Sequence, residues 1–143
     1  NERTKHVYTS HERAGIINDL LAGIKPYIKE DDCLFAYGSI PAINYMTRTR
    51  PFIGCSWPEL LSAPLLKQKL NNYKGPLPAI LRQKFDSIGK EFGTPDENYL
   101  IDCGVEAGTF KSNKKSQVVN EFIEKNNYKI VFENQYFILF LPQ

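Results

Sequence analysis

The sequence predicts an α/β domain with three layers: a mostly parallel sheet, flanking helices and a C-terminal antiparallel hairpin. Short apolar runs alternate with segments of helical periodicity, a pattern typical of strand–helix–strand units with right-handed crossovers. The run Cys33–Tyr37 carries no charge, which suits a strand covered on both faces. Two apolar runs near the C-terminus flank Asn134 and Gln135, which favours a hairpin.

Length and composition fit one soluble domain spanning residues 1–143. The chain is 42% hydrophobic and 24% charged, as in packed globular proteins. Its formal net charge of +2 is too small for the electrostatic footprint of a nucleic-acid binder, so we expect no nucleic-acid partner. The lysines at 111, 114 and 115 are interpreted as a solvated helix start rather than a phosphate patch. Asn1 is not an initiator residue, so we expect the domain to come from a longer or processed gene product.

The first predicted helix covers residues 9–29. Thr9 and Glu12 form a capping-box pattern, and Pro26 predicts a bend because it lacks a backbone donor. The strand Cys33–Tyr37 follows, and Ser39 is the expected N-cap of a short helix over 42–46. The apolar positions with helical spacing in the first helix are Ile16, Ile17, Leu20, Leu21, Ile24 and Ile28.

The middle of the chain predicts two more strands. Residues 51–55 and 77–84 have strand character, and 58–70 predicts a helix that Pro64 weakens. Residues 86–98 predict a loop or short insertion. Residues 99–103 fit a strand or a helical turn equally well.

The last third predicts one helix and the hairpin. Residues 117–125 are amphipathic, with Val118, Val119, Phe122 and Ile123 inward, and the following asparagines suit a left-handed cap. The hairpin strands are expected at 128–132 and 136–141.

No catalytic pattern stands out. The sequence has no G-x-S-x-G, G-x-x-x-x-G-K or H-E-x-x-H. Its histidines, at positions 6 and 11, are interpreted as exposed side chains, and its acidic pairs, at 31–32 and 96–97, as turn residues. The three cysteines, at 33, 55 and 103, lack C-x-x-C spacing and are interpreted as small buried side chains. We therefore expect no catalytic residue, no metal site and no cofactor.

One segment does predict a binding edge. Ligands of open α/β sheets bind beyond the carboxyl ends of strands, where helix N-termini present free amides, and Gly38 and Ser39 would lie there. Amide, phenol and guanidinium groups that suit hydroxyl or phosphate oxygens follow. The alternative is a tight turn with two arginines that cap a helix C-terminus or pair with carboxylates. Trp57 is a candidate sugar-stacking surface or a side chain packed on a helix start. The candidate ligand-binding residues are Gly38, Ser39, Asn44, Tyr45, Arg48, Arg50 and Trp57.

Residues 32–51, DCLFAYGSIPAINYMTRTRP, resemble a specific pattern. It occurs in C-terminal soluble domains of bacterial polytopic membrane proteins similar to GT-C glycosyltransferases, a group that includes dolichyl-phosphate-mannose-protein mannosyltransferase relatives. There a strand with YG-x-x-P, a helix with an aromatic pair and T-x-R-P follow one another. The closing segments 128–134 and 136–140 resemble the last hairpin of those domains. The resemblance implies that catalytic carboxylates lie in a membrane-embedded part, so none is assigned to this chain.

The resemblance and the residues together give two functional hypotheses. The first is a non-catalytic domain on the extracytoplasmic (periplasmic) side of a bacterial inner membrane, part of a membrane glycosyltransferase-like protein. Its partners would be the membrane-embedded part of the same chain and a lipid-linked sugar, sugar-phosphate or acceptor that it helps to bind. The second is a free-standing α/β enzyme or a binding module for a small sugar-like or phosphorylated ligand.

Overall fold

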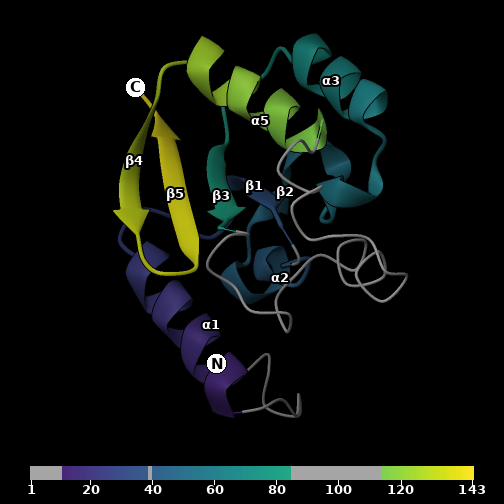
Figure 1. The fold of residues 1–143 in the computed structure, drawn as a ribbon. Helices are drawn as coiled ribbons and strands as arrows, with labels where there is room; N and C mark the ends of the chain where they lie inside the picture. The colour runs from purple at the N-terminus through teal and green to yellow at the C-terminus, as the bar shows by residue number, and fades with distance from the viewer. Residues whose placement is uncertain (1–10, 39, 85–113) are drawn as a thin grey trace, which may run out of the picture.

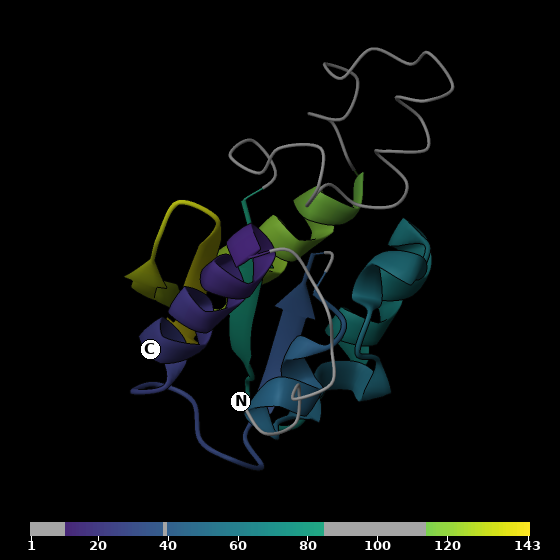
Figure 2. The same ribbon diagram turned by 90° about the horizontal axis from the view of Figure 1, so that it is seen from below.

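A mixed five-stranded sheet with helices on both faces forms the centre of the protein (Figures 1 and 2). The computed structural model describes residues 11–38, 40–84 and 114–143. The strand order is β2-β1-β3-β5-β4. The strands are β1 (Cys33–Tyr37), β2 (Arg50–Pro51), β3 (Ala79–Gln83), β4 (Tyr128–Glu133) and β5 (Phe137–Pro142). The described helices are α1 (His11–Ile24), α2 (Ile43–Thr47), α3 (Ala63–Asn72) and α5 (Lys114–Lys125).

The sheet is mixed rather than mostly parallel. β1 pairs in parallel with β2 on one side and with β3 on the other, as expected for an interior strand. β5 pairs antiparallel with both β3 and β4. β4 therefore runs in the same direction as β3, and the hairpin places β5 between them. The strand–helix alternation correctly predicted that β1, β2 and β3 are parallel, and the predicted C-terminal hairpin is antiparallel. The sheet as a whole is mixed because β5 also pairs antiparallel with β3.

Alternate residues of β1 enter two separate cores, because successive side chains of a strand point to opposite faces. Leu34 and Ala36 pack with α1, α2 and β5 residues such as Leu20, Ile43 and Leu139. On the other face, Phe35 and Tyr37 pack with residues of α3 and α5, among them Leu66, Leu70 and Val119. The ring centroids of Phe35 and Phe52 are 5.5 Å apart, which anchors the segment after β2 to the second core. The absence of charge in Cys33–Tyr37 thus reflects cover on both faces.

The strand predicted at 51–55 is wrong beyond its first residue. β2 ends at Pro51, and Phe52–Gly54 forms a 3-10 turn in which Ile53 has φ 53° and Gly54 has φ 66°. Left-handed backbone angles cannot continue a strand. The apolar run instead reverses the chain and places Phe52, which is fully buried, in the core.

Proline sets the limits of two helices that the sequence predicted too long. α1 ends at Ile24 rather than near Lys29, and Pro26 follows within the next turn, where it has no N–H to donate. The helix predicted at 58–70 divides into a 3-10 turn at Pro58–Leu60 and α3, which begins at Ala63 with Pro64 in its first turn. In α3, Leu66 and Leu70 are buried, whereas Leu65 is exposed.

The C-terminal region follows its prediction closely. Val119 and Phe122 of α5 are buried, and Asn127, just beyond the helix, has φ 52°. In the hairpin turn, Oδ1 of Asn134 accepts hydrogen bonds from the backbone N–H groups of Tyr136 and Phe137, at 2.9 and 2.8 Å. The predictions for Thr9 and for residues 86–103 lie outside the described residues.

Candidate functional site

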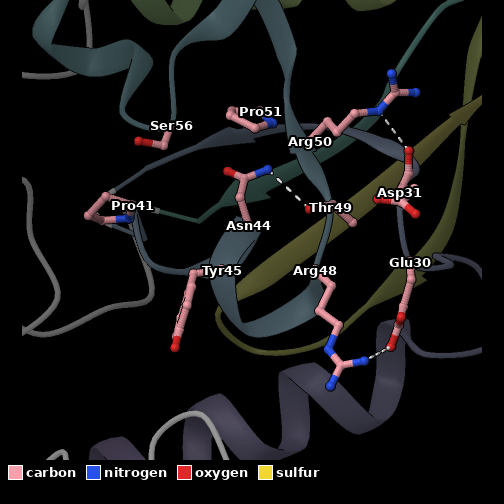
Figure 3. Close-up of a pocket in the computed structure, with 10 residues that line it drawn as sticks. All are labelled: Glu30, Asp31, Pro41, Asn44, Tyr45, Arg48, Thr49, Arg50, Pro51 and Ser56. Atoms are coloured by element: carbon pink, nitrogen blue, oxygen red, sulfur yellow. Dashed lines mark hydrogen bonds and ion pairs between the residues drawn. The ribbon is translucent and has the colours of Figure 1, made fainter.

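An open hollow of about 650 Å³ lies beside α2 and the edge strand β2, where β1 and β2 begin (Figure 3). Four of the predicted ligand-binding residues line it: Asn44, Tyr45, Arg48 and Arg50. The hollow therefore gathers most of the side chains that the sequence predicted together. Its other lining residues are Glu30, Asp31, Pro41, Thr49, Pro51 and Ser56.

Asn44 is buried beneath the hollow and links α2 to the sheet. Its Nδ2 donates to the backbone oxygen of Leu34 at 3.2 Å and to Oγ1 of Thr49 at 3.1 Å. Thr47 and Thr49 share a further hydroxyl contact of 2.9 Å. Oδ1 of Asn44 is also buried and has no hydrogen-bond partner in the structure. Both hydrogen bonds of the Asn44 amide nitrogen go to other groups of the protein. Asn44 therefore supports the floor of the hollow rather than presenting its Nδ2 group to a ligand.

Arg48 is held by a carboxylate. It is the C-cap residue of α2, with φ 57°, and its Nη1 lies 2.7 Å from Oε1 of Glu30. Both side chains are more than half exposed, so the pair contributes less than about 1 kcal/mol to stability. This is the pairing that the structural alternative for the two arginines predicted.

Arg50 faces away from Arg48. Its Nε donates to the backbone oxygen of Asp31 at 2.9 Å, which ties β2 to the turn before β1. Figure 3 shows the two guanidinium groups on different sides of the site, each turned toward the segment at residues 30–31. The two arginines therefore do not converge on one position where an anion would bind.

The hollow also presents two exposed neutral polar groups, a phenol and a hydroxyl. Tyr45 is 58% exposed, and Ser56 is exposed as well. These neutral groups donate and accept hydrogen bonds and can meet hydroxyls of a ligand. The hollow thus suits a polyhydroxylated ligand better than an anion.

Neither Gly38 nor Trp57 is among the residues that line the hollow. Gly38 follows the opposite, carboxyl end of β1 and has φ 138°, and a Cβ there would meet Cβ of Gln83 at 2.5 Å. Ser39 lies outside the described residues. The helix expected over 42–46 is present as α2 at Ile43–Thr47, but the expected N-cap at Ser39 is wrong, because the N-cap is Ala42, which makes no side-chain cap. Trp57 is partly buried before the Pro58–Leu60 turn, and its Nε1 is buried without a hydrogen-bond partner in the structure.

Sequence reasoning missed a polar cluster at the carboxyl ends of β1 and β3. Tyr37 and Arg82 are register partners there, and both lie on the face covered by α5. The phenol oxygen of Tyr37 is 3.4 Å from Oγ of Ser116, and Nη1 of Arg82 donates to Oδ1 of Asn120. Burial lowers the pKa of Arg82, and the nearby Tyr37 partly opposes that shift. The signal in the sequence was a single arginine at the end of an apolar strand.

Other features of the described residues set the chemical context. Within residues 11–38, 40–84 and 114–143, no three His, Cys, Asp or Glu side chains are grouped so that they could hold a metal ion. Cys33 and Cys55 are free thiols, and burial raises the pKa of Cys33. Cys103 and His6 lie outside the described residues.

No helix in the described part of the chain has the length and hydropathy to cross a bilayer.

The comparisons with known proteins add no relative. The sequence matches no protein-family model, and neither the curated proteins nor the solved structures contain a significant match.

Proposed function

We propose that this chain is a non-catalytic domain on the extracytoplasmic side of a bacterial inner membrane, within a protein similar to GT-C glycosyltransferases. In this role the membrane-embedded part carries out transfer. The domain contributes a surface that contacts the sugar or acceptor of a lipid-phosphate-linked substrate. The sequence resemblance of residues 32–51 is the basis for the assignment to this group.

One observation carries the proposal: the segment that bears the resemblance also builds most of the hollow. Within residues 32–51, α2 and β2 provide Asn44, Tyr45 and Arg50, and the connections around them provide Pro41, Arg48 and Thr49. The sheet itself requires only Cys33–Tyr37 and the buried side chains of α2 from this segment. The additional polar residues at the surface support a binding role for the same stretch.

The lining also supports a contact role rather than a catalytic one. Its arginines are engaged by Glu30 and by the Asp31 carbonyl, and its buried amide is engaged by Leu34. General acid–base catalysis needs a titrating group aimed at the reacting atoms, and nucleophilic catalysis needs a nucleophile beside a base. The exposed groups at Tyr45 and Ser56 instead suit hydrogen bonds to sugar hydroxyls.

The gene that encodes this chain tests the membrane assignment. We expect several apolar stretches of about 20 residues upstream of Asn1, each long enough to span a bilayer. The purified 143-residue chain should then show no transfer from a polyprenyl-phosphate sugar or a sugar nucleotide. An initiator codon just before Asn1, or turnover by this chain that one point substitution abolishes, would favour a free-standing enzyme.

Substitution of Tyr45 tests the role of the hollow. In the full-length gene product, Tyr45→Ala should lower transfer from a polyprenyl-phosphate sugar by roughly 2- to 10-fold, since a typical hydrogen bond contributes about 0.5–1.5 kcal/mol. Tyr45→Phe separates the hydroxyl from the ring. Lys129→Gln, an exposed change on β4, is the matched surface control. Transfer that is the same for Tyr45→Ala and Lys129→Gln would remove the hollow from the proposal.

A further inference from the structure

The path of the chain creates a topological switch point between β1 and β3. From β1 the chain passes through α2, on the α1 face of the sheet, to β2. From β2 it passes through α3, on the opposite face, and returns beyond β1 to β3. α5, the next described helix after β3, lies on the face opposite to α2, and the chain continues from β1 and from β3 toward opposite edges of the sheet. In open α/β sheets ligands bind at such a point, beyond the carboxyl ends of the strands. Figure 2 shows the ends of β1 and β3 and the first turn of α5 at the same end of the sheet.

Arg82 lies at this switch point, and no carboxylate of the described residues pairs with it. It is partly buried at the end of β3, and no ion pair within the described residues involves it. Its contact there is with the neutral amide oxygen of Asn120. A cation that is partly removed from water and paired only with a neutral group is stabilised by an anion that binds beside it.

The neighbours of Arg82 offer donors to such an anion. Because Oδ1 of Asn120 accepts from Arg82, the exposed Nδ2 of the same amide remains to donate. Ser116, one turn before Asn120 on α5, has its hydroxyl 3.4 Å from the phenol oxygen of Tyr37. Lys115 adds a positive charge to the first turn of α5, where its Nζ donates to the Glu59 carbonyl at 2.6 Å.

We propose that the carboxyl ends of β1 and β3 form a binding site for a phosphate group, with Arg82 as its anchor and Ser116 and Asn120 as further donors. A guanidinium binds phosphate through two parallel N–H···O bonds, and the remaining phosphate oxygens accept from the hydroxyl and amide. This site lies at the opposite end of β1 from the hollow. It does not depend on the proposed function, because its parts belong to the fold itself.

The test is a titration of the 143-residue chain with inorganic phosphate at constant ionic strength, followed by ¹H–¹⁵N NMR. We expect saturable binding of one phosphate, and at least about tenfold weaker binding by Arg82→Gln, since hydrogen bonds to charged groups contribute about 1.5–3 kcal/mol. Lys129→Gln removes the same charge from an exposed site on β4 and should change the affinity less than twofold. Equal weakening by the two variants, or no saturable binding at millimolar phosphate, would overturn the proposal.

Two further variants keep the test decisive if Arg82→Gln fails to fold. Arg82→Lys retains the charge but removes the paired N–H donors of the guanidinium, and Asn120→Ala removes a donor on the exposed face of α5. Each variant should weaken phosphate binding several-fold. Unchanged affinity in both would show that Arg82 has only a structural role. Acetate at the same ionic strength should bind much more weakly than phosphate. Equal binding of the two would contradict the assignment to phosphate.

The source of the phosphate is separated by two further probes. Glucose 1-phosphate tests a small soluble phosphate ester, and a short-chain prenyl phosphate in bicelles tests a lipid headgroup. The probe that binds more tightly than inorganic phosphate, with the same loss in Arg82→Gln, identifies the class of ligand. Failure of both probes to bind would contradict a role for the site in ligand recognition.

Discussion

The arginines at the two ends of β1 differ in their partners, because one of them at the amino end is paired with a carboxylate. At the amino end, Arg48 pairs with the carboxylate of Glu30, and Arg50 donates to the carbonyl of Asp31. At the carboxyl end, Arg82 is the more buried, and its guanidinium donates to the neutral amide oxygen of Asn120 beside the phenol of Tyr37. The comparison teaches that the number of arginines near a sheet edge says little about anion binding. What matters is whether a carboxylate already pairs with the guanidinium, as Glu30 does with Arg48.

The backbone at the carboxyl end of β1 tolerates substitution less well than the backbone at its amino end. Gly38→Ala should destabilise the protein by about 2–4 kcal/mol, because φ 138° is unfavourable for alanine and the new Cβ would meet Gln83 at 2.5 Å. Gly54→Ala is the matched control, with φ 66° and nothing within 4 Å of an added Cβ, and should cost only about 1–2 kcal/mol. Urea unfolding of both variants measures the difference. Equal losses would show that the contact with Gln83 relaxes without cost.

The amino end depends on its buried amide. Asn44→Ala should cost about 1–3 kcal/mol of unfolding free energy, because the backbone oxygen of Leu34 loses a buried donor. Thr47→Ala, which removes a partly buried hydroxyl from the same network, should cost less. Chemical denaturation compares the two. A smaller loss for Asn44→Ala than for Thr47→Ala would mean that another group replaces its bond to Leu34.

The smallest effect is expected for the surface ion pair. Arg48→Ala and Glu30→Ala should each change the unfolding free energy by less than about 1 kcal/mol, and a double-mutant cycle should give a coupling of a few tenths. Coupling should fall further in 0.5–1 M salt because exposed charges are screened. A coupling well above 1 kcal/mol would show that the pair is a structural element of the hollow and would weaken the contrast with Arg82.

The sequence correctly predicted those strands, helices and turns that are determined by residues close together in the chain. The uncharged Cys33–Tyr37 run, the α5 periodicity and the Asn134 turn all appear as expected. The strand expected at 51–55 failed because an apolar run also suits a turn that buries one aromatic ring, and only the backbone angles of Ile53 and Gly54 distinguish the cases.

The candidate site was predictable only where its residues are close together in the chain. Residues 44–50 are close in sequence, so α2 and β2 bring them to one hollow. The partners of the arginines come from the turn before β1, and the pairings could not be read from composition. Arg82 was missed because its neighbour Asn120 lies 38 residues away along the chain and reaches it only when α5 packs on the sheet.

The arginine Hε–Nε correlations of the 143-residue chain test the central contrast most directly. Inorganic phosphate, added at constant ionic strength, should shift the Arg82 resonance in a saturable way. The Arg48 resonance should stay in place, because the Glu30 carboxylate already pairs with its guanidinium group. Saturable shifts of Arg48 or Arg50 with a stationary Arg82 resonance would contradict the account and place the anion site at the amino end of β1.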